Sequence, residues 1–363
     1  MSEPSKLNVL IAGMGYAGSR FLSALRTLDG GHGAGADLEI AYHARHRTRE
    51  DIPYYASIAE ALTHFRPDVV IVAVTDSAHA EVLTALDGYE GFVLAEKPLT
   101  SRNDDLDAVA RALARTSGFA LDLVERYSDA TAALRDHVRR SGLTLVRAHA
   151  TWGKDRINDH RPTVGVTSEV IHSLDLLQWI APGGHTVTPA GVLGVSSDFS
   201  ISGPDVLDSV ALTATLGEAP VTVYSSFTNI TRQRTVDLTF RDPDGGLVYA
   251  SAVYDTPVWD ADRLRIWRRV PDGEETLCEV DTTTERAAEQ LRAIVKLRRL
   301  VADVLRYVRT GEAPQVAFAG LEESLALQRL LNDIEDAAAT TGPARYFPGD
   351  RTIATEIDWE RLG

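Results

Sequence analysis

The six residues from Gly13 to Gly18, GMGYAG, constrain the fold of this chain more than any other short stretch. They follow the apolar run KLNVLIAG, which is typical of a strand buried on both faces, and they open a segment with helical spacing of apolar residues. In such a turn Gly13 allows a tight bend, Gly15 lets the backbone approach a pyrophosphate, and Gly18 permits close packing. The stretch predicts a dinucleotide site made of Gly13, Met14, Gly15, Tyr16, Ala17 and Gly18; the alternative is a bare strand-to-helix turn.

Strand and helix patterns alternate through the first third of the chain. Buried-strand runs such as PDVVIVAVT and GFVLAE are separated by helical segments such as SIAEALTHF and SAHAEVLTALDG, with short turns between them. This order predicts an α/β class of fold, with a doubly wound parallel Rossmann sheet over residues 1–125.

The remainder, residues 126–363, has a different pattern. From Leu143 onward, alternating runs such as TLVRAHATW, DSVALTATL and LVYASAVYD predict a large, mostly antiparallel open sheet. Helices are expected in SEVIHSLDLLQWI and in the last seventy residues, where they could pack back on the first domain. We therefore expect an α+β domain that binds substrate and carries the subunit contacts.

Composition limits the function classes. The chain has 363 residues, enough for about two domains. Its formal net charge of −15 argues against a nucleic-acid partner or an anionic membrane, both of which favour a basic face. The longest apolar run, VVIVAV, is far too short to span a bilayer, and the first residues lack the pattern of a secretory signal. We expect a cytoplasmic protein that acts on a small-molecule substrate.

The end of the second predicted strand bears on the choice of dinucleotide. NAD-binding proteins usually place an acidic residue there to hold the ribose hydroxyls. Here the strand ends YHARHRTR, with Arg45 near its end and no acid before Glu50. A basic group suits a 2′-phosphate, so we favour NADP with Arg45 as its contact; the alternative is NAD bound by other groups beside a solvated arginine cluster.

The segment GFVLAEKPLT places Glu96 and Lys97 directly after the fourth buried strand. Ligands of doubly wound sheets bind at the carboxyl ends of the strands, so Lys97 is expected at the crevice. Pro98 fixes its own φ and removes a backbone donor, which would aim the lysine reproducibly.

The EKP segment, together with the glycine-rich turn upstream, resembles the Gfo/Idh/MocA family, whose members include relatives of glucose–fructose oxidoreductase and inositol dehydrogenase. AVTDSAH, VERYSD and SEVIHSLDLLQW are similar to further family segments and occur in the family's order. The closing stretch VADVLRYVRTGEAPQVAFAGLEESLALQRLL is also similar, so the resemblance covers nearly the whole chain.

The resemblance implies an NAD(P)-dependent oxidoreductase that transfers hydride between nicotinamide and a carbonyl or carbinol of a sugar-like substrate, such as a keto-sugar or a nucleotide-linked sugar. It assigns proton transfer to Lys97 and His172. Cofactor contacts are expected from Thr75, His79, Glu96, Lys97 and Arg126, and substrate contacts from Tyr127 and Asp175. Asp175 could instead pair with a neighbouring donor inside the fold. It also implies a homodimer or homotetramer through the sheet of the second domain.

The polar stretch TWGKDRINDHRP adds candidate substrate contacts. The candidates are Trp152, Lys154, Asp155, Arg156, Asp159 and His160; a solvated loop is the alternative. No metal is expected, because His160 and His172 lack a recognisable ligand spacing and hydride transfer of this type needs none.

The helix that carries His172 departs from the family pattern, which has an Asp four residues before the histidine and a Gly two before it. This chain has Ser168 and Val170 at those positions, and Glu169 lies three residues before His172. Positions three apart share a helix face, so Glu169 is a candidate partner of His172 and the third catalytic residue. Alternatively it serves the helix N-terminus, with Ser168 or Thr167 as the cap.

Two other functions remain open. An imine or enone reductase of a small metabolite would use the same hydride and acid geometry. A non-catalytic NADP-binding sensor of the same fold is also compatible, because a fold alone does not establish a function.

Overall fold

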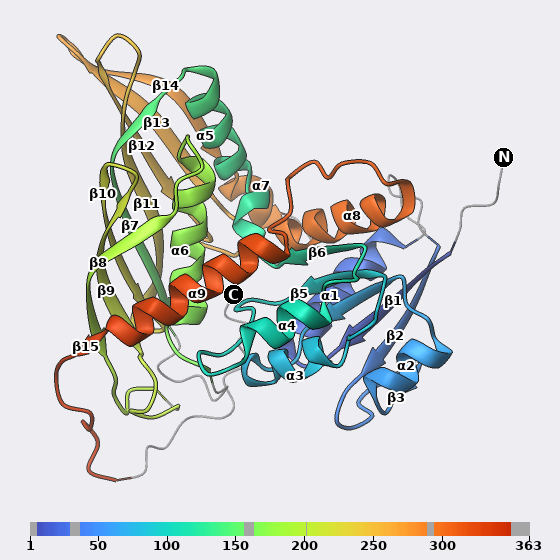
Figure 1. The fold of residues 1–363 in the computed structure, drawn as a ribbon. Coiled ribbons are helices and arrows are strands. Elements are labelled where there is room, and N and C mark those ends of the chain that lie inside the picture. Colours follow the sequence, from blue (N-terminus) through green and yellow to red (C-terminus); the bar gives the residue numbers. More distant parts are fainter. Residues whose placement is uncertain (1–5, 30–36, 156–162, 201, 289–293, 350–363) are drawn as a thin grey trace. The chain divides into compact units, whose positions relative to one another are not determined.

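The computed structural model describes residues 6–29, 37–155, 163–200, 202–288 and 294–349 (Figure 1). The chain divides into two compact units. The first comprises Met1–Val124 and Ile294–Arg329, and the second comprises Glu125–Ala293 and Leu330–Gly363. The domain boundary predicted from the sequence lies between residues 125 and 126, with the closing helices able to pack back on the first domain.

A six-stranded parallel sheet forms the centre of the first unit, in the order β3-β2-β1-β4-β5-β6 (Figure 1). Every residue of β4 and β5 is buried, as expected for a parallel sheet covered on both faces. The strand order reverses between β1 and β4, where sheets of this type bind their ligands. The strands are β1 (Leu7–Ala12), β2 (Leu38–His43), β3 (Tyr54–Tyr55), β4 (Val69–Val72), β5 (Phe92–Ala95) and β6 (Gly118–Leu121).

Short helices connect these strands. The helix α1 buries the apolar stripe that its spacing predicted, including Phe21, Leu22 and Leu25, and it packs against α8. The helices α3 and α4 pack against each other. The elements are α1 (Tyr16–Leu28), α2 (Ile58–His64), the 3₁₀ turn η1 (Asp76–Ala78), α3 (His79–Thr84), α4 (Leu106–Ala112) and α8 (Val295–Thr310). The division between the units falls within α9 (Leu321–Ala337).

The second unit is built on a nine-stranded, mostly antiparallel sheet in the order β14-β13-β12-β11-β7-β10-β9-β8-β15 (Figure 1). The helices α5 and α6 pack on one face of it, α6 against β7 and β10 and α5 against β12 to β14. This arrangement, with the parallel sheet of the first unit, confirms the predicted fold class. The helical elements are η2 (Val124–Tyr127), α5 (Asp129–Arg140), α6 (Thr167–Ile180) and α7 (Thr283–Ala288). The strands are β7 (Thr144–Asp155), β8 (Val187–Val195), β9 (Ser209–Leu216), β10 (Ala219–Ser226), β11 (Thr228–Arg241), β12 (Leu247–Val253), β13 (Arg263–Val270), β14 (Gly273–Asp281) and β15 (Ala339–Thr340).

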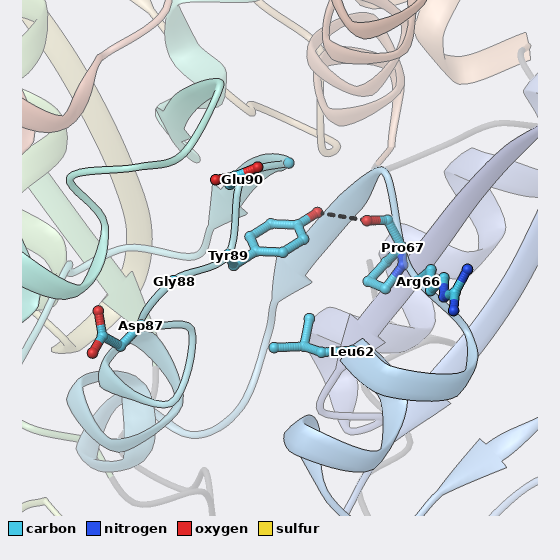
Figure 2. A pocket seen from close by; sticks show the side chains of 8 residues that line it. Leu62, Arg66, Pro67, Asp87, Gly88, Tyr89 and Glu90 are labelled. Atoms are coloured by element: carbon cyan, nitrogen blue, oxygen red, sulfur yellow. Dashed lines mark hydrogen bonds between the residues drawn. The ribbon is translucent and has the colours of Figure 1, made fainter.

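A shallow hollow of about 460 Å³ lies at the amino ends of β4 and β5 (Figure 2). Tyr89 forms part of its wall and donates a hydrogen bond of 3.0 Å from its hydroxyl to the Pro67 carbonyl. This hollow is at the opposite edge of the sheet from the glycine-rich turn, so it is not the predicted dinucleotide site.

In the part of the chain that the structure describes, no helix combines the length and apolar character needed to cross a membrane.

Candidate functional site

The glycine-rich turn connects β1 to α1, and each of its three glycines has a distinct environment. Gly13 has a φ of +102°, and a Cβ there would come within 2.5 Å of the Ala73 backbone. A Cβ at Gly18 would come within 2.0 Å of the Gly13 carbonyl oxygen. Nothing lies within 4 Å of a Cβ built on Gly15. Gly13 and Gly18 are therefore required by the fold itself, whereas Gly15 leaves space beside the backbone.

The start of α1 suits an anionic ligand. Gly15 is the N-cap residue, it makes no side-chain capping bond, and the first turn contains no acidic residue. Tyr16 is 47% exposed beside this turn, and the Arg20 guanidinium lies 5.7 Å from the centre of its ring. The open space at Gly15 and the helix start without a side-chain cap fit a dinucleotide pyrophosphate. Met14 and Ala17, which flank Gly15 and Tyr16, are half-buried. The roles of these residues in binding stay predictions.

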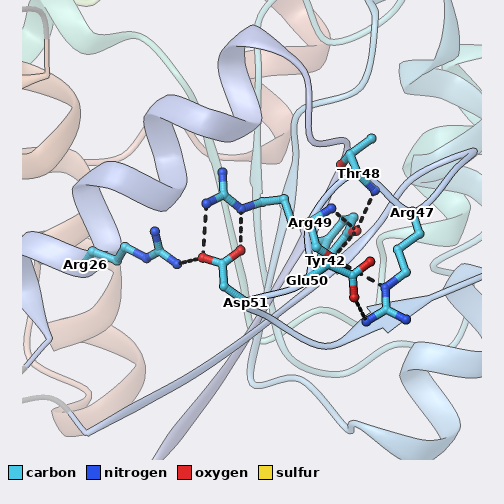
Figure 3. Close-up of polar contacts among 7 residues, drawn as sticks. All are labelled: Arg26, Tyr42, Arg47, Thr48, Arg49, Glu50 and Asp51. Atoms are coloured by element: carbon cyan, nitrogen blue, oxygen red, sulfur yellow. Dashed lines mark hydrogen bonds and ion pairs between the residues drawn. The ribbon is translucent and has the colours of Figure 1, made fainter.

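The loop after β2 carries several arginines, of which Figure 3 shows Arg47 and Arg49 with their acidic partners. Arg47 pairs with Glu50 at 2.7 Å, and Arg49 donates two hydrogen bonds to Asp51, of 2.9 and 3.1 Å. Arg49 and Arg26 together hold the pKa of the Asp51 carboxyl well below its usual range. Arg45 is exposed and joins no ion pair among the described residues, so its guanidinium is available for a ligand.

The hydroxyl of Tyr42 fixes the backbone of this loop. It accepts hydrogen bonds of 2.8 Å from the amides of Thr48 and Arg49, and it donates one of 3.1 Å to the Arg49 carbonyl (Figure 3). Tyr42 itself is fully buried in β2.

The ends of β4 and β5 bring further predicted residues to the same edge of the sheet. Thr75 is exposed at the start of η1, and Glu96 and Lys97 are half-buried directly after β5. The Lys97–Pro98 bond is cis. His79, predicted as a cofactor contact, is wholly buried; its Nδ1 is 2.6 Å from the Pro98 carbonyl and its Nε2 is 3.2 Å from the Val74 carbonyl. These contacts join the loops after β4 and β5, so His79 holds the backbone of the two loops in place.

Asp122 belongs to this edge and was missed by the sequence analysis. It follows β6, it is 6% exposed, and its backbone amide donates to the Ala95 carbonyl at 2.8 Å. Burial raises the pKa of its carboxyl well above the usual value; the charge of Glu96 and a hydrogen bond with it act in the same direction, against Arg20 and Lys97. The parallel register, in which Ala95 pairs with Leu121, could have predicted that Asp122 lies beside Glu96.

In the second unit, α6 and β7 bring His172 and Trp152 together. The two rings are stacked, with centroids 5.1 Å apart and an interplanar angle of 19°. His172 is 6% exposed, whereas Trp152 is 0% exposed and also packs against Tyr254. The buried Trp152 ring thus packs flat against the imidazole and supports it, and its contact with substrate stays a prediction.

Glu169 lies in the first turn of α6 and is completely buried. Its Oε1 accepts a hydrogen bond of 2.6 Å from Lys154 Nζ. Neither Ser168 nor Thr167 is the predicted cap. The helix begins at Thr167, its N-cap residue is Val166, and no side chain caps it. Ser168 instead donates from its hydroxyl to the Gly165 carbonyl at 2.9 Å. Lys154, predicted as a substrate contact, thus neutralises Glu169; a role of Glu169 as partner of His172 stays a prediction.

Arg126 and Asp175, which the sequence analysis assigned separately to cofactor and substrate, pair with each other inside the second unit. Arg126 Nε donates to both carboxylate oxygens of Asp175, at 3.1 and 3.0 Å, and both side chains are at most 3% exposed. The Arg126 guanidinium also lies 4.2 Å from the centre of the Trp179 ring. These contacts give the pair a structural role, which for Asp175 is the alternative of pairing with a neighbouring donor inside the fold. Tyr127, beside Arg126 in η2, is 7% exposed.

Arg234 is a second functional candidate that the sequence analysis missed. Its guanidinium forms an ion pair with Asp255 and lies 3.9 Å from Glu125, 5.0 Å from the Trp152 ring centre. Burial acts against its charge, but Asp255 and then Glu125 outweigh burial, so the pKa of Arg234 is raised. Arg234 lies two residues before the buried Val236 in β11, and side chains two apart in a strand point to the same face. The alternation of buried residues in this strand could therefore have predicted that Arg234 is buried.

Among the described residues, no group of three or more His, Cys, Asp or Glu side chains could hold a metal ion. Arg156, Asp159 and His160, predicted as substrate contacts, lie outside the described residues.

Residues 7–121 match the family model GFO_IDH_MocA, described as an oxidoreductase family with an NAD-binding Rossmann fold. This part of the chain is therefore an NAD-binding Rossmann domain of an oxidoreductase. Over residues 7–121 this match confirms the family that the motifs predicted.

Solved structures share the fold over most of the chain. An oxidoreductase domain protein from Kribbella flavida has 17% identity and a TM-score of 0.70, covering 92% of this chain and 97% of its own. UDP-N-acetylglucosamine 3-dehydrogenase from Acidithiobacillus ferrooxidans has 17% identity and a TM-score of 0.65, covering 92% and 98%. Levoglucosan dehydrogenase in complex with NADH has 14% identity and a TM-score of 0.70, covering 92% and 97%. No curated protein sequence matches the chain.

Proposed function

We propose that this protein is an NAD(P)-dependent oxidoreductase that transfers hydride between the nicotinamide and a carbonyl or carbinol of a sugar-like substrate. The observation that carries the proposal is the turn after β1, where two glycines are needed for packing and Gly15 leaves open space at an uncapped helix start. The family match supports the redox class, and the two dehydrogenases of similar fold, which act on sugar derivatives by name, support the substrate class.

Lys97 and His172 are the proposed proton-handling residues. The bound nicotinamide supplies or accepts the hydride. Reduction of a carbonyl leaves an oxyanion that needs a proton, and oxidation of a carbinol needs a base. Lys97, half-buried at the carboxyl end of β5, and His172, held flat against Trp152, are suited to these tasks on their respective units.

The cofactor is proposed to be NADP, with Arg45 as the group that contacts the 2′-phosphate. Arg47 and Arg49 are occupied by Glu50 and Asp51, which leaves Arg45 as the exposed arginine of this loop without such a pair among the described residues.

We also propose that the protein is cytoplasmic and forms a homodimer or homotetramer through the second unit's sheet. One face of that sheet is free of the helices α5 and α6, and it exposes Leu193 by 48% and Tyr224 by 39%. The strand registers through Ala211 place both side chains on the same face. Exposed apolar groups on one sheet face are typical of a surface that a second copy covers.

The test of the enzymatic proposal is a screen of NADPH oxidation against keto-sugars, including nucleotide-linked ones, followed by the variant Lys97→Ala. We expect turnover with at least one substrate and a loss of kcat of about 100-fold or more in Lys97→Ala, the usual contribution of a general acid or base. Lys6→Ala is the matched control, because Lys6 is exposed on the same unit and pairs with Glu39 at 2.8 Å.

Cofactor binding without any turnover, unchanged by Lys97→Ala, would contradict the enzyme and favour the sensor function. Turnover with imines or enones alone would favour the reductase of small metabolites.

A further inference from the structure

Tyr254, Arg234 and Trp152 form a row of buried side chains across the sheet of the second unit. Arg234 is directly opposite Trp152 in the antiparallel register of β11 and β7, and its carbonyl accepts a hydrogen bond of 2.9 Å from the Tyr254 amide. Each of the three residues is at most 2% exposed. Side chains that face each other across neighbouring strands lie on the same face of the sheet. The row therefore lies beneath His172, whose imidazole stacks on its Trp152 member.

The guanidinium of Arg234 lies over two indole rings. It is 5.0 Å from the centre of the Trp152 ring and 4.8 Å from that of the Trp259 ring. An ion pair with Asp255 holds it from the loop after β12, and Glu125 Oε1 lies 3.9 Å from Arg234 Nη1. A guanidinium within about 6 Å of a ring centre is attracted to the ring, and most strongly when it is removed from water. The contact therefore restrains the Trp152 indole.

A buried arginine is a costly way to support a ring. Taking a charged side chain out of water is unfavourable, and apolar residues of similar volume often stabilise a fold as well as a buried ion pair does. Packing alone therefore does not account for an arginine opposite Trp152. A planar guanidinium differs from an apolar group because its partner Asp255 fixes its position and because it attracts the face of the indole.

We propose that Arg234 is a positioning residue, which fixes the orientation of the Trp152 indole and, through it, that of the His172 imidazole. The two rings are 19° from parallel with centroids 5.1 Å apart, so a change in the indole displaces the imidazole. Proton transfer requires a ring nitrogen within hydrogen-bond reach of the substrate oxygen. The consequence for turnover rests on the proposed function of His172.

The first experiment observes the His172 imidazole by NMR without substrate. Its ring signals are assigned by their absence from the spectrum of His172→Gln. Arg234→Lys keeps a positive charge but removes the planar guanidinium from the Trp152 ring. We expect the His172 signals to shift in Arg234→Lys, and unmoved signals overturn the proposal. Should this variant fail to fold, Asp255→Asn, which releases the guanidinium from its ion pair, is measured in its place with the same expectation.

Arg232→Lys is the matched control. Arg232 lies two residues earlier on β11, and its guanidinium is also over the Trp259 ring, at 4.6 Å. The register of the described strands gives Arg232 no partner in β7. We expect the His172 signals to stay in place in this variant. An equal shift in Arg232→Lys and Arg234→Lys overturns the proposal.

A double-mutant cycle separates an effect through Trp152 from a general disturbance of the fold. Trp152→Phe replaces the indole by a smaller ring. If Arg234 acts through the indole, Arg234→Lys shifts the His172 signals less in the Trp152→Phe protein than in the unaltered one. Equal shifts in the two proteins indicate a general disturbance and overturn the positioning role.

The second experiment uses turnover. We expect kcat to fall by about tenfold or more in Arg234→Lys, because a displaced imidazole is a poorer proton-transfer group. Cofactor affinity should stay unchanged, since the glycine-rich turn belongs to the first unit. An unchanged kcat overturns the positioning role. If the protein has no turnover with any substrate, the proposed function fails, and the His172 spectra still decide whether Arg234 positions the imidazole.

Discussion

Arg45 differs from the neighbouring arginines by its lack of an acidic partner among the described residues. A charge-assisted hydrogen bond contributes about 1.5–3 kcal/mol, which is at least a tenfold change in affinity. We predict that Arg45→Asp weakens NADP binding by about tenfold or more and leaves NAD binding nearly unchanged, as measured by fluorescence titration of the reduced cofactors.

The control is Arg47→Asp, because Arg47 already pairs with Glu50 and we expect a smaller effect on NADP. The proposal of NADP is abandoned if the protein binds NAD as tightly as NADP and Arg45→Asp changes neither affinity.

Some site residues could be placed from the sequence, and others could not. The spacing of motifs predicted that Lys97 follows a buried strand, because a strand end depends on local sequence alone. It did not predict that Trp152 is covered or that Arg126 pairs with Asp175, 49 residues away. Such contacts depend on strand register and helix packing, which periodicity does not specify.

The turn between β1 and α1 supports a prediction at the scale of one element. Gly15→Ala adds a methyl group to open space, so we expect the melting temperature to change little while cofactor affinity falls about tenfold or more. Gly18→Ala forces a methyl group against the Gly13 carbonyl, and we expect a loss of stability of about 1–3 kcal/mol. Thermal unfolding measures the stability of the two variants, and cofactor titration measures their affinity. An equal loss of stability in the two variants would contradict a binding role for Gly15 and a packing role for Gly18.

Elements with strong apolar periodicity were predicted well, and weakly patterned ones were missed. The strands of the first unit were found because each is a short buried run. The strand β14 was predicted only in part, as a strand with Cys278 near its end, because most of its residues are exposed and GEETLCEVD shows no buried alternation. The strand β8 contains Pro189 and two glycines, which indicate a turn rather than a strand. The helix α5 was overlooked, although Ser128 caps it through its hydroxyl.

At the scale of the whole molecule, the exposed sheet face predicts self-association. We expect light scattering to give the mass of a dimer or tetramer, and Tyr224→Asp to shift the population towards monomer, because a charge would be buried in the contact. Ala132→Asp, on the exposed side of α5, is the control and should not change the mass. A monomeric mass for the unaltered protein would refute the proposed assembly.

The three hydrogen bonds of the Tyr42 hydroxyl have a consequence for redesign of this protein. They fix the backbone from Thr48 to Arg49 through a side chain that is buried and therefore does not contact the cofactor. The loop therefore has its shape before a dinucleotide arrives, and surface side chains such as Arg45 can be exchanged without rebuilding the main chain. Cofactor preference in this protein is then a trait that side-chain substitutions can change, as long as Tyr42 is retained.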